Sequence, residues 1–459
     1  MFKKIEIWIL YLTLILVVIS YIFYGAVVRR YSIYGEHLPV FKPISIISVF
    51  LAEIPSNFKK ILNYRKPTRI KMAEVNPEKF GFNGEALNFD SYLLMPRYNS
   101  NVNQSTVELI DLKTFEVLHE WKPEINEIWS KIRNEKIKKH YLKKISIRNF
   151  RAKHALMTKD GGLIVKNNSP LLKLDSNSNV IWMLEDAKYH HGMELDHEGN
   201  IWVCVEYKPY KTKEIYSGKW NDKYYSQNPF KDDGIRKISN DGDILFDKPL
   251  TEIFLENDLE HLLVNPNNNH RDLFHLNDIQ PVYENSTFWE VGDVFLSLRH
   301  QNFIIHYRPN TNEIIHLIDV NKICFGQHDI DIISNSKISI FNNNTKFYSK
   351  HKKVFKNNEI IIYDFKNNTF TNDYKDLLSN HNIKTIGEGL CEIMPNNDLF
   401  IEETGRGRLL YFNSDGELKW SFYNRPYAGA NSHIISWSRI LYQKEDLAIV
   451  NNFLKSIAK

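Results

Sequence analysis

Short strand-like segments that repeat one internal pattern constrain the fold of this sequence more than any other feature. Four of them can be aligned with one another: HALMTKDGGLIV (154–165), HGMELDHEGNIWV (191–203), HDIDIISNSKISIF (328–341) and GLCEIMPNNDLFI (389–401). Each alternates polar and apolar residues, turns at Asn, Asp or Gly, and continues as an apolar strand. Units of about four strands, repeated in this way, are typical of a β-propeller.

The number of repeats predicts the architecture. Units begin near residues 91, 154, 191, 277, 328 and 389, which indicates six blades. Residues 124–145 interrupt the pattern with apolar side chains at helical spacing, so we expect a helical insertion between blades. Residues 85–459 are therefore predicted to form an all-β, six-bladed β-propeller, with a pair of β-sandwiches as the alternative fold.

The N-terminal segment predicts an association with a membrane. Residues 5–28 are apolar apart from Glu6, and this length suffices for a helix that spans a bilayer. The stretch YGAVVRR at its end is a poor signal-peptidase site, so we expect an uncleaved anchor over residues 1–30 and a linker over residues 31–84. Basic residues lie on both sides of the apolar segment, and they leave its orientation open.

Composition limits the function classes. The hydrophobic content of 43% and the charged content of 25% are those of a globular protein. A net charge of +4 is small for 459 residues and gives no reason to expect binding of nucleic acid. Cys204, Cys324 and Cys391 lie far apart, which argues against a zinc knuckle or a dense disulfide framework. We interpret them as small, half-buried apolar residues, with one long-range disulfide as the alternative.

Histidines recur where the inner strands of the predicted blades begin. Inner strands line the central channel of a propeller, so the loops that enter them converge on one face. The repeat aligns Lys153, His191, Asn277, His328 and Gly389 at this position. We therefore expect His190, His191, His275 and His328 to converge with Asp278, Asp329 and Asp331. Neighbouring strand residues face opposite ways, and the repeat favours His191 over His190 as the residue that faces the channel.

A second group of polar residues lies in the fourth unit. The segment FLSLRHQNFIIHY (295–307) places Arg299, His300 and Gln301 between two strands. The planar guanidinium of an arginine offers two parallel donors to a tetrahedral oxyanion such as sulfate or phosphate.

In order along the chain, the motifs YHHGMELDHEGNIWV, HLNDIQPV, LSLRHQNFIIHY and GQHDIDIISNSKISIF resemble those of the bacterial arylsulfate sulfotransferases. The resemblance covers roughly residues 85–445. It implies a six-bladed propeller that moves a sulfuryl group from an aryl sulfate ester to a phenol or another hydroxyl acceptor. It also implies that the transfer passes through a sulfated histidine and needs no cofactor, no metal and no nucleotide sulfate donor.

The same resemblance assigns roles to residues. His328 matches the nucleophile of the family, His191 and His275 match two further channel histidines, and Arg299 matches an arginine that binds sulfate. The residues expected to bind substrate beside them are His190, Asn277, His300, Gln301 and Asp329.

The chain also departs from the family pattern. It has FNNN (341–344) where many relatives have Asp-Asn-Gly, and it lacks both the long N-terminal β domain and the close cysteine pair of those relatives.

Elementary chemistry agrees with these roles. A neutral imidazole is nucleophilic at neutral pH, and His191 or His275 can act as general acid and base. Asp329 or Asp331 can orient the His328 ring, although Asp331 aligns with Glu194 and Glu392 and is expected to be structural.

Two other function classes remain open at this stage. One is a channel enzyme that depends on a transition metal, and the other is a non-catalytic scaffold or glycan-binding module anchored in the membrane. For the transferase, the resemblance implies a single-pass protein of the bacterial inner membrane with its propeller in the periplasm. The sequence leaves the physiological donor, the acceptor and the oligomeric state unassigned.

Overall fold

The computed structural model describes residues 6–34, 43, 47, 50, 54, 76–135, 137–138, 150–207, 231–263, 272–348 and 351–458. The chain divides into two compact units, Met1–Pro67 and Thr68–Lys459.

The described part of the first unit contains one long helix, α1 (Ile7–Tyr34). Its segment Ile7–Val27 has a mean hydropathy of 2.4 and lies outside any protein core. By length and composition it is a candidate membrane span, and a signal sequence near an N-terminus has the same properties. Most of the predicted linker, including residues 55–75, lies outside the described residues.

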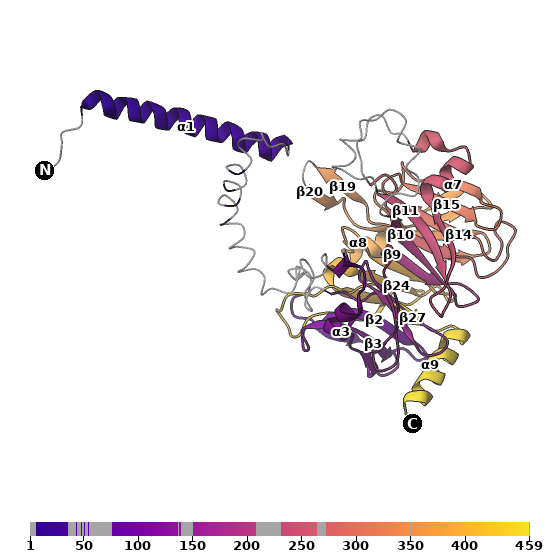
Figure 1. Ribbon diagram of the computed structural model, residues 1–459. Helices are drawn as coiled ribbons and strands as arrows, with labels where there is room; N and C mark the ends of the chain where they lie inside the picture. The colour runs from indigo at the N-terminus through magenta and orange to yellow at the C-terminus, as the bar shows by residue number, and fades with distance from the viewer. Residues whose placement is uncertain are drawn as a thin grey trace. The chain divides into compact units, whose positions relative to one another are not determined.

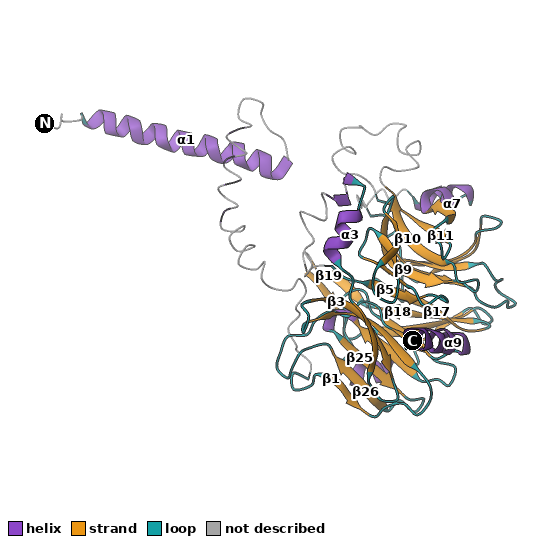
Figure 2. Cartoon of the chain, turned by 60° about the horizontal axis from the view of Figure 1, so that its bottom comes forward, coloured by secondary structure: helices purple, strands orange, loops and turns teal. Residues whose placement is uncertain are grey.

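The second unit is a six-bladed β-propeller (Figures 1 and 2), as the repeats predict. Blade 1 combines β27 (Arg439–Leu441), β2 (Tyr92–Asn99), β3 (Gln104–Asp111) and β4 (Val117–Trp121). Blade 2 contains β5 (Lys153–Met157), β6 (Leu163–Lys166), β7 (Leu171–Leu174) and β8 (Val180–Leu184). Blade 3 contains β9 (Lys188–Leu195), β10 (Ile201–Tyr207), β11 (Asp232–Ile238) and β12 (Ile244–Pro249).

The remaining blades follow the same antiparallel order. Blade 4 contains β13 (Leu276–Pro281), β14 (Val294–Leu298), β15 (Phe303–Arg308) and β16 (Glu313–Asp319). Blade 5 contains β17 (His328–Ser334), β18 (Lys337–Asn342), β21 (Glu359–Asp364) and β22 (Thr369–Thr371). Blade 6 contains β23 (Leu390–Ile393), β24 (Leu399–Glu403), β25 (Arg408–Phe412), β26 (Leu418–Tyr423) and β1 (Gly81–Gly84). A separate hairpin joins β19 (Thr345–Tyr348) to β20 (His351–Val354).

Both ends of the propeller sequence close the ring. Strand β27, near the C-terminus, pairs with β2 near the start of the propeller, with Tyr92 opposite Leu441. Strand β1 adds a fifth strand to blade 6 by pairing with β26. The closing strands therefore come from opposite ends of the unit, so the first and last blades depend on one another for their hydrogen bonds.

The described helices of the propeller unit are short, apart from the C-terminal one. They are α3 (Ile125–Lys131), α7 (Leu250–Glu256), α8 (Lys375–Asn380) and α9 (Lys444–Ile457), with single turns at Glu260–Leu262 and Thr404–Arg406. Helix α3 occupies the start of the predicted insertion, which continues into residues 139–149 outside the described part. Helix α9 packs Val450 and Phe453 into the same core cluster as Trp121.

A left-handed backbone conformation occurs at or near the start of every inner strand, and in β9 it lies within the strand, at His191. Its φ angles lie between 48° and 77° at His154, His191, His275, Asp329, Glu388 and Trp437. This conformation is uncommon for residues other than glycine, so its recurrence once per blade defines a structural register. The register differs from the sequence alignment, which placed Lys153, Asn277, His328 and Gly389 at the position of His191.

Buried carboxylates join successive blades near these turns. Asp233 accepts the Leu276 amide at 2.9 Å, Asp278 accepts the Ile330 amide at 2.7 Å, and Asp329 accepts the Cys391 amide at 2.7 Å. Glu402 accepts the amides of Trp437 and Ser438 at 2.9 and 2.6 Å. These bonds fix the neighbouring inner strands against one another where the histidines lie.

Candidate active site

Imidazoles from three blades meet where the inner strands begin. The ring centroid of His191 lies 4.9 Å from that of His275 and 6.3 Å from that of His328. Blades 3, 4 and 5 thus bring together three residues that are far apart in the sequence. Burial and the neighbouring imidazole of His275 hold the pKa of His191 well below its ordinary value, so its ring is neutral at neutral pH.

The partners of His328 determine which ring nitrogen carries its proton. Nδ1 lies 2.5 Å from Oδ1 of Asn343 and 3.2 Å from the carbonyl oxygen of Gly326. On the other side, the backbone N–H of Glu388 donates to Nε2 at 3.2 Å. A carbonyl only accepts and an amide N–H only donates, so Nδ1 is protonated and Nε2 presents a lone pair.

His328 is also held in its neutral form. Its side chain is almost fully buried. Burial, reinforced by the positive charge of Arg299, lowers the pKa of His328 to about 3. A neutral ring with an available Nε2 lone pair is the form of histidine that acts as a nucleophile.

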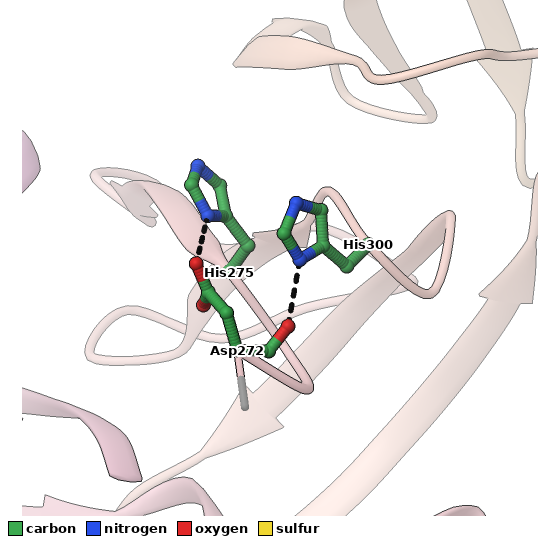
Figure 3. Close-up of side chains that lie close together, drawn as sticks. All are labelled: Asp272, His275 and His300. Atoms are coloured by element: carbon green, nitrogen blue, oxygen red, sulfur yellow. Dashed lines mark hydrogen bonds and ion pairs between the residues drawn. The ribbon is translucent and has the colours of Figure 1, made fainter. Parts of the chain in front are cut away.

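Asp272 organises two further rings (Figure 3). Its Oδ2 lies 2.8 Å from Nδ1 of His275, and its carbonyl oxygen lies 2.6 Å from Nδ1 of His300. The two rings stack with centroids 4.3 Å apart, and both point their Nε2 atoms away from Asp272. Burial alone would raise the pKa of Asp272, but bonds from His275 and Lys231 outweigh it and hold this pKa well below its ordinary value. Asp272 is therefore a carboxylate that supports His275.

Arg299 is a buried cation beside these rings. Its side chain is 6% exposed, and it forms no ion pair with a carboxylate in the described part of the chain. Nη1 of Arg299 lies 3.4 Å from Nε2 of His300. Nε of Arg299 has no hydrogen-bond partner in the described part of the chain. Gly326 lies directly against the guanidinium, since a Cβ at that position would be 3.3 Å from Nη2. A buried guanidinium without a carboxylate is suited to an anionic ligand.

The other residues predicted to bind substrate have protein partners. His190 faces Asp233, with Nε2 3.3 Å from Oδ1. Asn277 donates to the carbonyl oxygen of Gln327 at 2.7 Å, and Gln301 donates to that of Leu262 at 3.0 Å.

The two aspartates proposed to orient the His328 ring lie elsewhere. Asp329 accepts the Cys391 amide, and burial raises the pKa values of Asp329 and Asp331 well above their ordinary range. Asn343 contacts Nδ1 of His328 in their place.

Three residues of the site were not singled out by the sequence: Asp272, Asn343 and Glu388. Asp272 and Glu388 precede their inner strands, and Asn343 follows β18. None of them lies in the aligned part of a strand. The only signal for Asn343 was its place in FNNN, the stretch that departs from the family pattern.

The fold and the site together define a class of proteins: six-bladed β-propellers in which imidazoles and a guanidinium gather near the starts of the inner strands. The model of the arylsulfotransferase (ASST) family matches residues 154–425, which is more than half of the chain. The chain belongs to this family.

Other known proteins add little to this assignment. No curated protein matches the sequence. A Bacteroides caccae protein of unknown function superimposes with a TM-score of 0.46 at 10% identity, over 77% of this chain and 100% of that one. Virginiamycin B lyase from Staphylococcus aureus superimposes with a TM-score of 0.38 at 10% identity, over 78% of this chain and 100% of the lyase. We base no functional argument on either similarity.

Proposed function

We propose that this protein transfers a sulfuryl group from an aryl sulfate ester to a hydroxyl acceptor, through a sulfohistidine at His328. Family membership supports sulfotransferase activity in general. The observation that carries the specific mechanism is the buried guanidinium of Arg299, which forms no ion pair in the described part of the chain, next to a neutral His328 whose Nε2 presents a lone pair. The anion holder and the nucleophile thus lie side by side.

In the first half-reaction, Nε2 of His328 attacks sulfur. A nitrogen–sulfur bond forms, the bond from sulfur to the aryl oxygen breaks, and the electron pair leaves with the phenolate. Arg299 holds the non-bridging oxygens, whose charge must be stabilised as in phosphoryl transfer. The Glu388 N–H, which donates to Nε2 in the free protein, is released as sulfur approaches.

His275 serves as the general acid and base. It protonates the departing phenolate, and in the second half-reaction it takes the proton of the incoming hydroxyl, whose oxygen attacks sulfur and frees His328. The Asp272 carboxylate at 2.8 Å stabilises the positive charge that His275 carries before it protonates the phenolate and again after it takes the proton of the acceptor. Catalysis of this kind contributes about 10²–10⁴-fold.

The test uses the full chain with a chromogenic aryl sulfate and a phenol. Wild-type protein is expected to gain the mass of one sulfuryl group on His328, to release phenol in a burst, and to lose the group when acceptor is added. His328→Ala should show neither labelling nor transfer. Transfer that survives His328→Ala would contradict the mechanism and would leave a scaffold or another enzyme as the alternative.

A metal-dependent function is the second candidate, because two clusters among the described residues have the composition of a metal site and one of them lies among these imidazoles. Ligand atoms of Asp272, His275 and His300 lie within 4.8 Å of one another. Nε2 of His300 faces Arg299, however, and the guanidinium would repel a bound cation. We therefore favour the transferase. Stoichiometric transition metal in purified protein, together with activity that a chelator abolishes, would reverse this preference.

We also propose that α1 anchors the protein in the bacterial inner membrane and that the propeller lies in the periplasm. The support is the apolar length of Ile7–Val27 together with the family. Protease treatment of spheroplasts tests this, since a periplasmic propeller is degraded and a cytoplasmic one is protected. Retention of residues 7–27 in the mature protein, measured by intact mass, distinguishes an anchor from a signal sequence.

A further inference from the structure

We propose that Asn343 is the positioning residue of His328: it holds the Nδ1–H of the ring and thereby aims Nε2 at the sulfur of the donor. This inference rests on the proposed function for its catalytic meaning. The contact itself, 2.5 Å between Oδ1 of Asn343 and Nδ1 of His328, belongs to the fold.

The orientation of the Asn343 amide is determined by its other contacts. Its Nδ2 donates to the carbonyl oxygens of Thr385 at 3.2 Å and Glu388 at 2.8 Å. A flipped amide would place Oδ1 against these two oxygens and Nδ2 against a protonated Nδ1. Since both changes replace attraction with repulsion, Oδ1 faces His328.

The position of Asn343 also explains why it reaches the ring. His328 pairs with Phe341 across β17 and β18, and Asn343 lies just past the end of β18 on the same side of the blade. The Asn343 side chain is fully buried, and Nδ2 of Asn358 donates to its carbonyl oxygen at 2.7 Å. The amide therefore has no room to swing away from the imidazole.

The three asparagines of FNNN (341–344) form different hydrogen bonds. Asn342 accepts the amides of Phe325 and Asn344, each at 2.9 Å, and so fixes the loop before His328. Asn344 donates to the carbonyl oxygens of Phe355 at 2.7 Å and Asn357 at 3.2 Å. Only Asn343 contacts the catalytic ring. The stretch that departs from the family pattern thus supplies a partner of the nucleophile.

An uncharged hydrogen-bond partner such as Asn343 suits His328, because this nucleophile must also act as the leaving group in the second half-reaction. When sulfur binds Nε2, positive charge develops on the ring, and the Asn343 oxygen stabilises it through the Nδ1–H bond. An amide oxygen carries only a partial charge, so it stabilises the sulfated ring less than a carboxylate would. The acceptor can then displace the imidazole in the second half-reaction.

The test compares Asn343→Ala with Asn344→Gly in the full chain. The control also removes two bonds from an asparagine Nδ2 to carbonyl oxygens, and glycine tolerates the φ of 49° at position 344. In ¹⁵N-histidine-labelled wild type, we expect a protected Nδ1 proton on His328, assigned by its absence in His328→Gln. Asn343→Ala should lose this protected proton and slow the sulfation of His328 by about 10²-fold, with little change in the KM of the donor.

Each outcome has a defined meaning. A protected proton and a wild-type sulfation rate in Asn343→Ala would overturn the proposal. Equal losses of the protected proton and of the sulfation rate in Asn343→Ala and Asn344→Gly would overturn the proposal as well, because they would indicate a general packing effect. If wild-type protein is not sulfated, but its Nδ1 proton is protected and is lost only in Asn343→Ala, the proposed function fails and the positioning of His328 by Asn343 stands.

Discussion

Replacing Asp272 by Asn tests the acid–base role of His275 most directly. The substitution keeps the size of the side chain and removes its charge. Lys231 and His275 both contact Oδ2 of Asp272, at 2.7 and 2.8 Å, so an asparagine whose oxygen takes this place keeps both contacts. The substitution then removes only the negative charge beside His275.

The size of the effect follows from the contact distance. Two unit charges about 4 Å apart interact by about 4 kcal/mol at an effective dielectric constant of about 20. Lys231 already takes up part of the carboxylate charge, so we assign about 2–3 kcal/mol to the support of a cationic His275. Asp272→Asn should therefore lower kcat by about 10²-fold.

The assay compares leaving groups. 4-Nitrophenolate departs without protonation, whereas unsubstituted phenolate needs the proton of His275. Measured on the burst of phenol release, which reports the first half-reaction alone, the loss in Asp272→Asn should accordingly be large with phenyl sulfate and small with 4-nitrophenyl sulfate. Equal losses with both donors would refute the role of His275 as the acid.

Blade 4 supplies a matched control. Asp293 lies 2.8 Å from Nε2 of His306, and the ring of this second buried pair stacks on Phe295, a member of the core between blades 4 and 5. Asp293→Asn should lower stability and leave the dependence on the leaving group unchanged. If it reproduces the leaving-group pattern of Asp272→Asn, the argument from local charge is wrong.

Three further predictions concern single side chains. Arg299→Lys keeps the charge and loses the planar fork, so the KM for an aryl sulfate should rise about 10-fold, against about 10²-fold for Arg299→Ala in steady-state assays. Burial lowers the pKa of Lys166, whose Nζ has no hydrogen-bond partner in the described part of the chain. Denaturant titration should find Lys166→Met more stable than wild type at pH 7, an advantage that shrinks toward pH 10 because an unfolded lysine then gains less from protonation. Burial and the charge of Asp446 raise the pKa of Glu392 from 4.5 to about 8, so wild type loses stability relative to Glu392→Gln as pH rises between these values. A constant difference across that range in the same titration would show that Glu392 is not held protonated.

The sequence predicted the fold well because the blade repeat is local. Alternation within a strand and turn residues between strands are both readable over about a dozen residues. The exact register was harder to predict, since an extra residue at the head of an inner strand shifts the alignment. His191 and His275 share the left-handed conformation, but His328 comes one residue before it, and Asp329 takes the equivalent place.

The partners of the catalytic rings could not be predicted for a different reason. Asp272 lies three residues before His275, outside the aligned strands, and its contact depends on the course of a loop. Asn343 lies fifteen positions after His328 in the chain, beyond the end of the strand that pairs with β17. A repeat shows which strands converge, but it does not show which side chains of the connecting segments fold back toward the channel.

The different partners of the two imidazoles give the strongest reason to assign them different tasks. His328 faces an amide oxygen, a carbonyl oxygen and a guanidinium, and burial there lowers its pKa to about 3. His275 faces a carboxylate whose own pKa is held well below the ordinary value. Positive charge is therefore disfavoured on the first ring, and the second ring lies beside a negative charge. A nucleophile must keep its lone pair free, and an acid–base group must give up a proton in one step and take one up in the next, so the electrostatics match His328 to the first task and His275 to the second.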